Sequence, residues 1–80
     1  MPMKDIMWNT IMLKEFESLA CLSEEEKIVL HEWAHGKSIV NTSMMHHMSE
    51  RKVKEIRLTL RQKYDAVQIY TPLLPARSSK

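Results

Sequence analysis

Hydrophobic residues recur along the chain at helical spacing, and no stretch alternates between apolar and polar positions as a half-buried strand would. A broad apolar arc predicts a first helix from about Met3 to Ala20. Met7 and Ile11 fall outside that arc, which leaves them available to a partner or to a second copy of the chain. The arc itself consists of Ile6, Trp8, Met12, Leu13, Phe16, Leu19 and Ala20.

The second predicted helix has a clear signal at each end. Ser23 followed by Glu26 forms an S-x-x-E capping box, which satisfies two backbone N–H groups at a helix start. Gly36, the only glycine, can adopt the left-handed conformation that ends a helix. We therefore expect a helix between these two signals. Its buried residues should be Val29, Leu30, Trp33 and Ala34.

A short third helix is predicted from Ile39 to His46, because Ser38 can cap its first turn. A tight turn at His47 and Met48 should follow it. Histidine tolerates a left-handed turn better than a bulky residue does, so this position is compatible with the turn.

The fourth predicted helix is the longest, capped by Ser49 and running to about Tyr64. Its core stripe consists of Val53, Ile56, Leu60 and Tyr64. The opposite side carries Arg51, Lys54, Glu55, Leu58 and Gln62, with Arg57 and Arg61 at its flanks. A short helix, a tight turn and a longer basic helix are the outline of a helix-turn-helix, so the predicted fold is an all-α, four-helix domain that contains this unit.

The charge is distributed unevenly, although the net charge is only +2. Residues 1–35 contain three basic and seven acidic side chains, whereas residues 36–80 contain nine basic and three acidic ones. Between residues 49 and 63 there are six bases against two acids, which concentrates the positive charge on the fourth helix. A charge run alone is more often a solvated face, but combined with this outline it indicates an anionic partner.

The single cysteine excludes an intrachain disulfide and indicates a reduced, cytoplasmic environment. We expect Cys21 to be a small core residue, with a disulfide across a dimer as the alternative. Charged residues interrupt the apolar N-terminal segment, so it matches neither a signal peptide nor a membrane span.

About half of the chain resembles LuxR-type helix-turn-helix domains and the similar region four of sigma factors. The resemblance is carried by Leu22, Ser23, Glu26, Val29, Leu30, Ala34, Gly36, Ser38, Met48, Ser49, Val53 and Lys54. The run S-E-R-K-V-K-E-I is similar to the start of the recognition helix in these families. The closing K-Y-D-A-V-Q and L-L-P-x-R also resemble small sigma-like proteins of gut clostridia and their mobile elements.

The resemblance implies that Lys54, Glu55 and Leu58 face DNA bases in the major groove. It also implies that Arg51, Lys52 and Arg61 lie near phosphates, and Arg57 and Gln62 complete the expected DNA-binding surface. Most of the affinity should come from phosphate neutralisation by the basic side chains Arg51, Lys52, Arg57, Arg61 and Lys63. Leu58 has an alternative role, as a contact for a partner helix.

Three positions depart from the family pattern. An aliphatic residue is usual where this chain has Thr42 and His46, and a glycine is common in place of His47. We expect Met44 and Met45, together with Met48, to fill the resulting space.

The chain divides into residues 1–21 (a helix for packing or dimerisation), 22–66 (the DNA-binding core) and 67–80 (a tail). Pro72 and Pro75 exclude a long helix in the tail, so Leu73 and Leu74 should fold back on the core. Residues 77–80 form a basic end.

The run HEWAH matches H-E-x-x-H, in which two histidines hold zinc and the glutamate is the general base. However, Gly36 ends the helix at once, no third ligand follows, and no strand is predicted to hold a substrate. We therefore expect His31 and His35 on the outer surface, where adventitious zinc or nickel binding remains open. His46 and His47 could add ligands, although a capped or partly buried turn is the simpler interpretation.

The leading hypothesis is a cytoplasmic, bacterial, sequence-specific DNA-binding regulator without enzymatic activity, cofactor or functional metal, which forms a homodimer through residues 3–20. The alternative is a sigma-like interaction module that binds RNA polymerase or another regulator through its methionine-rich N-terminal helix. Neither hypothesis involves a membrane.

Overall fold

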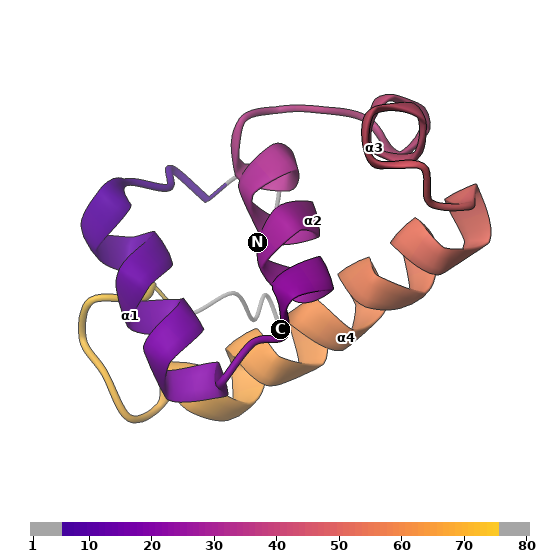
Figure 1. Ribbon diagram of the computed structural model, residues 1–80. Helices are drawn as coiled ribbons and strands as arrows, with labels where there is room; N and C mark the ends of the chain where they lie inside the picture. Colours follow the sequence, from indigo (N-terminus) through magenta and orange to yellow (C-terminus); the bar gives the residue numbers. More distant parts are fainter. Residues whose placement is uncertain (1–5, 76–80) are drawn as a thin grey trace.

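The computed structural model describes residues 6–75, which form four α-helices and no β-strand (Figure 1). In order these are α1 (Thr10–Ala20), α2 (Glu24–Ala34), α3 (Ile39–His46) and α4 (Glu50–Gln68). The longest helix, α4, contacts each of the other three, which lie along one side of it. The predicted all-α, four-helix domain is confirmed. None of these helices is both long and apolar enough to cross a lipid bilayer.

Helix α1 begins at Thr10, so the predicted start near Met3 is wrong where the structure describes the chain. Asn9 is the N-cap, and its Oδ1 accepts a hydrogen bond from the N–H of Met12 at 2.8 Å. Residues 6–8 are not helical, yet Ile6 is buried in the core. The apolar pattern of residues 6–8 therefore arises because a non-helical segment packs against the core. Residues 3–5 lie outside the residues that the structure describes.

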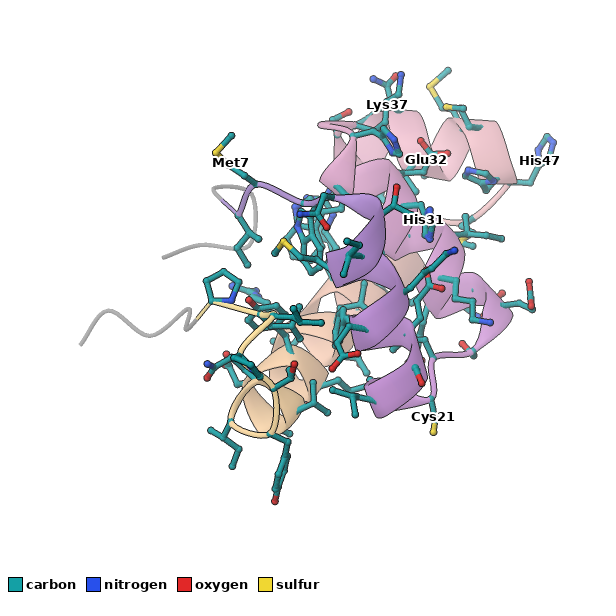
Figure 2. All side chains as sticks on the ribbon, turned by 90° about the vertical axis from the view of Figure 1, so that its left-hand side faces the viewer. Met7, Cys21, His31, Glu32, Lys37 and His47 are labelled. Carbon is teal, nitrogen blue, oxygen red and sulfur yellow. The ribbon has the colours of Figure 1, made fainter. Side chains whose placement is uncertain are left out.

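The C-terminal end of α1 also differs from expectation. Cys21 is exposed rather than in the core, and its side chain points away from the helices (Figure 2). It occupies the helix C-cap with a left-handed φ of 52°, which turns the chain toward α2. Leu19 lies on the predicted apolar arc but is 41% exposed, because the arc is wider than the surface that α1 buries.

Both predicted ends of α2 are confirmed. The Ser23 hydroxyl accepts from the N–H of Glu26 at 3.2 Å, and the Glu26 carboxylate accepts from the N–H of Ser23 at 2.9 Å. After Ala34 the chain turns through Gly36, whose φ is +82°. A β-carbon at Gly36 would meet nothing within 4 Å, so the glycine is favoured there by its backbone conformation and not by lack of space.

Helix α3 has its predicted bounds and is capped by Ser38, whose hydroxyl accepts from the N–H of Asn41 at 3.0 Å. Thr42 is fully buried, and its hydroxyl donates to the Ser38 carbonyl at 2.9 Å. A polar residue is therefore accommodated where the resembling families have an aliphatic one. His47 adopts a left-handed φ of 55°, which confirms the tight turn.

The methionines around this turn behave differently from one another. Met48 packs against the core, as expected. Met44 and Met45 are exposed, so the prediction that they fill space inside the domain is wrong. The physical reason is that the Thr42 side chain, with its hydroxyl satisfied by its own helix, already occupies the buried position.

Ser49 caps α4, and all four residues of the predicted core stripe are buried. The helix continues to Gln68 instead of ending near Tyr64. Val67 lies three residues after Tyr64 on the core-facing side and packs against the core, which extends the helix. The chain then turns before Pro72.

Three aromatic side chains form the centre of the core between α1 and α4. Phe16 lies with its ring centroid 5.4 Å from that of Tyr64, and Trp8 packs 6.0 Å from Phe16 and 5.8 Å from Tyr64. The Tyr64 hydroxyl donates to the carbonyl of Pro75, which holds the tail against α4.

The tail folds back with one of its two leucines. Leu74 is buried, as predicted, whereas Leu73 is exposed. Because adjacent residues in this turn point in different directions, the core accommodates only one of them.

Candidate nucleic-acid interface

The side of α4 that faces away from the other helices is open to solvent. This confirms the exposure predicted from the helical pattern. The exposed predicted site residues are Arg51, Lys52, Lys54, Glu55, Leu58, Arg61 and Gln62. Figure 1 shows that α1, α2 and α3 leave this side of α4 uncovered.

Leu58 lies near the centre of this exposed side and is 50% exposed. Beside it, Arg51 Nε and Glu55 Oε2 form an ion pair at 3.3 Å, one helical turn apart. Such exposed pairs contribute only about 0.3 to 0.5 kcal/mol, so either side chain can reorient toward a ligand. The centre of the surface thus combines an apolar contact with adaptable polar groups.

One flank of α4 is paired with the acidic start of α2. Lys52 Nζ lies 3.0 Å from Glu25 Oε1, and Lys63 Nζ lies 2.8 Å from Glu26 Oε1. We define these four residues as the paired flank. The sequence predicts that Lys52 and Lys63 lie near phosphates and that Glu26 belongs to a capping box, but it does not reveal that these lysines pair with Glu25 and Glu26.

Glu26 is the most strongly held carboxylate of this flank. Burial raises its pKa, but the hydrogen bonds and charge of Lys63, together with the hydrogen bonds from Ser23, outweigh burial. The pKa of Glu26 is therefore lowered below its ordinary value of 4.5. The carboxylate is ionised at neutral pH and neutralises Lys63.

The other flank carries Lys54, Arg57 and Arg61, spaced three and four residues apart along the helix. In residues 6–75 no carboxylate forms an ion pair with any of these three side chains. We define them as the open flank. Glu50 and Asp65 lie one helical turn before Lys54 and one turn after Arg61, so the positive charge of this flank is not ion-paired but is partly offset.

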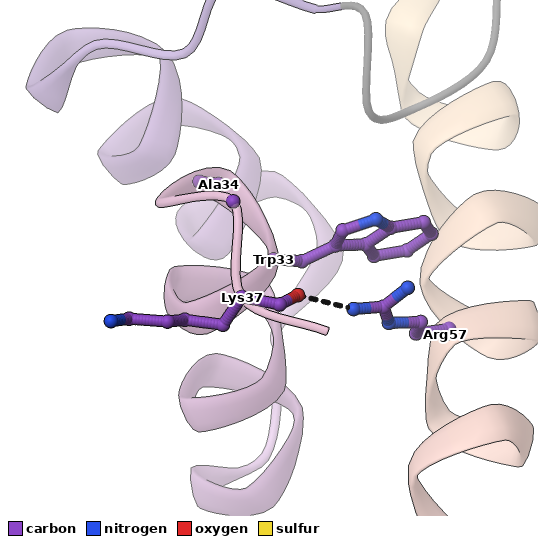
Figure 3. Close-up of a pocket in the computed structure, with 5 residues that line it drawn as sticks. Trp33, Ala34, Lys37 and Arg57 are labelled. Atoms are coloured by element: carbon purple, nitrogen blue, oxygen red, sulfur yellow. Dashed lines mark hydrogen bonds between the residues drawn. The ribbon is translucent and has the colours of Figure 1, made fainter. Parts of the chain in front are cut away.

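Arg57 is the one predicted site residue that the structure partly buries. Its guanidinium carbon lies 4.5 Å from the Trp33 ring centroid, and its Nη2 donates to the Lys37 carbonyl at 2.8 Å (Figure 3). Burial lowers the pKa of Arg57, and its Nε has no hydrogen-bond partner among the described residues. Arg57 thus fastens α4 to the loop that joins α2 to α3.

A cleft of about 210 Å³ lies beside this contact, lined by Trp33, Ala34, Gly36, Lys37 and Arg57. In Figure 3 only the backbone carbonyl of Lys37 faces the guanidinium, while its side chain extends to the opposite side. Of the residues that line this cleft, Arg57 is therefore the only one that directs a charged group toward it.

The residues of the HEWAH run face three different partners. His31 pairs with Glu17 of α1, Glu32 accepts from His46 of α3 at 2.9 Å, and His35 Nδ1 donates to the backbone carbonyl of His31 at 2.6 Å. Among the described residues, no three His, Cys, Asp or Glu side chains gather closely enough to hold a metal ion. His31 and His35 are on the surface, as predicted.

These histidines instead connect α2 to its neighbours. The pairs His31–Glu17 and His46–Glu32 join α2 to α1 and to α3, and both join residues 14 positions apart in the chain. These pairs could not be predicted from the sequence, because the two members of each pair lie on different helices and helical periodicity does not give their packing angle.

A second exposed surface lies at the start of α1. Met7 is 89% exposed and Ile11 is 65% exposed, which confirms that both lie outside the buried arc. Figure 2 shows the Met7 side chain projecting away from the ribbon. Exposed apolar groups of this size are common at protein contacts, although two of them alone do not define one.

No family model matches the chain, and no curated protein or solved structure is significantly similar to it.

Proposed function

We propose that this protein is a small DNA-binding transcriptional regulator whose α4 helix enters the major groove. The observation that carries the proposal is the uncovered side of α4, where cations without an ion-pair partner among the described residues border the half-exposed Leu58. Cations bind the phosphate backbone, and an apolar group among them can contact bases. A cytoplasmic location would follow from this function.

The dimensions of α4 suit this role. It has 19 residues and therefore spans about 28 Å at 1.5 Å per residue. A major groove about 12 Å wide admits one such helix. The preceding α3 and the left-handed turn at His47 support the resemblance to the helix-turn-helix of LuxR-type and sigma region-four domains.

The exposed side chains offer complementary contacts to base edges. Lys54 could donate to guanine O6 or N7, Glu55 could accept from cytosine N4, and Leu58 could pack against a thymine methyl group. Gln62 can form paired hydrogen bonds with adenine. Each good contact would discriminate against a wrong base by about 1 to 3 kcal/mol.

Mobility-shift titrations of duplex DNA with single-charge variants test the proposal. Lys54→Ala and Arg61→Ala should each weaken binding several-fold, because each removes an exposed cation of α4 that forms no ion pair with a described residue. Lys14→Ala is the matched control, since Lys14 is also exposed but lies on α1. If the unmodified chain does not bind, or if all three variants bind equally well, the proposal is wrong.

The exposure of Met7 and Ile11 supports the alternative, a sigma-like module that binds RNA polymerase or another regulator through α1. The same surface could join two copies of the regulator. Deleting α1 cannot separate these cases, because Met12 and Phe16 belong to the core. Charge substitutions at the surface are the appropriate test.

The test compares Met7→Glu combined with Ile11→Glu against the unmodified chain. If α1 joins two copies, the double variant should sediment as a monomer and bind DNA more weakly. If α1 binds RNA polymerase, the variant should lose polymerase binding but keep its oligomeric state. Unchanged behaviour in both assays would contradict both roles of α1.

A further inference from the structure

We propose that duplex DNA is held by only one flank of α4, the open flank of Lys54, Arg57 and Arg61. The paired flank of Lys52 and Lys63 is neutralised within the molecule and adds no net phosphate contact. The inference rests on the proposed function and specifies which cations meet the backbone.

The paired flank has a geometric basis. Lys52 and Lys63 are eleven residues apart, close to three full helical turns, so both side chains emerge from the same side of α4. The first turn of α2 supplies a carboxylate to each of them, at 3.0 and 2.8 Å. An approaching phosphate would meet two ion pairs without net charge.

Glu24 adds to this effect. It is exposed in the same turn of α2 and takes part in none of the ion pairs between described residues. Its negative charge would repel a phosphate backbone at this flank. The acidic residues at the start of α2 therefore do more than cap that helix, because they also disfavour DNA binding at the paired flank of α4.

The open flank has the opposite character. Lys54 and Arg61 lie seven residues apart, two turns of the helix, and both are exposed. Between them, Arg57 donates to a backbone carbonyl and contacts an indole ring, and neither of these partners carries a negative charge that would neutralise it. Three cations without carboxylate partners thus follow one edge of α4, where they can release counterions from DNA.

The salt dependence of binding separates the two flanks. Fluorescence anisotropy with a short labelled duplex of mixed sequence gives the affinity of the full chain over a range of salt concentrations. Lys52→Ala and Lys54→Ala are matched, because each removes one exposed lysine of α4. Lys54→Ala should reduce the slope of log affinity against log salt by about 0.9, the value for one phosphate contact, whereas Lys52→Ala should leave the slope unchanged.

A complementary pair of variants acts on the acidic residues. Glu25→Gln should free Lys52 and increase the slope by about 0.9. Glu24→Gln removes the same charge from the same turn but frees no lysine, so it should strengthen binding by relieving repulsion while its slope equals that of the unmodified chain. Circular dichroism of each variant checks that it is folded.

Two outcomes would overturn the inference while leaving the proposed function intact. These are equal slopes for Lys52→Ala and Lys54→Ala, or equal slopes for Glu24→Gln and Glu25→Gln. Absence of salt-dependent binding by the unmodified chain would overturn the proposed function as well.

Discussion

Replacing Glu26 by Gln removes one negative charge from a side chain that is only 15% exposed while keeping its shape. The carboxylate accepts hydrogen bonds from the N–H of Ser23 at 2.9 Å and from Lys63 Nζ at 2.8 Å. An amide oxygen can keep the capping contact, but it turns the ion pair with Lys63 into a weaker bond to a neutral acceptor. We expect the free energy of unfolding to fall by about 1 to 1.5 kcal/mol at neutral pH.

This loss should depend on pH in a defined direction. Because the folded-state pKa of Glu26 is lowered, its carboxylate stabilises the fold above the ordinary pKa of 4.5 that it has in the unfolded chain. That contribution is lost as the pH falls through the folded-state pKa. The stability difference between Glu26→Gln and the unmodified chain should therefore be full near neutrality and shrink below about pH 4.

Urea unfolding followed by circular dichroism, at about pH 7 and about pH 3, measures both effects. Glu24→Gln is the control, because Glu24 lies in the same turn but is exposed and has no ion-pair partner among the described residues. An equal loss in Glu24→Gln, or a loss in Glu26→Gln that persists undiminished in acid, would refute the role assigned to the Lys63 pair.

Three further changes test the fold by urea or thermal unfolding. Arg57→Lys should lower the free energy of unfolding by about 1 to 2 kcal/mol, because an ammonium group cannot reproduce the planar stack on Trp33. Phe16→Ala should lower it by about 3 to 5 kcal/mol, because Phe16 is fully buried between aromatic rings, whereas the exposed Leu19→Ala should have a much smaller effect. His47→Gly should raise it by about 1 kcal/mol, since a left-handed residue with a β-carbon is disfavoured by about 1 to 2 kcal/mol; a loss of stability would contradict the turn geometry.

The helix starts at Ser23, Ser38 and Ser49 could be predicted because a capping side chain bonds to a residue only three positions away. The start of α1 could not, because the apolar pattern continues through a non-helical segment. Asn9 is also a residue type that caps helices, so the sequence did contain a local signal for the observed start. Where a capping residue interrupts an apolar pattern, the two signals predict different helix starts. At Asn9 the helix begins at the cap and not where the apolar pattern begins.

The exposed side of α4 could be predicted from helical periodicity, since burial of one stripe exposes the opposite one. The paired and open flanks could not. The pair Lys63–Glu26 joins residues 37 positions apart, and its formation depends on how α2 crosses α4. The same crossing places Arg57 against Trp33. A helical wheel of α4 alone cannot predict this contact, because Trp33 belongs to α2.

The most direct test of DNA binding through α4 is selection of bound duplexes from a randomised library by the full chain. We predict enrichment of a defined sequence, lost or strongly weakened in Lys54→Ala and Arg61→Ala and retained in Lys14→Ala. A palindromic sequence would in addition indicate binding as a dimer. No enrichment by the unmodified chain, or the same enrichment by all variants, would contradict the assignment of α4 as the recognition helix.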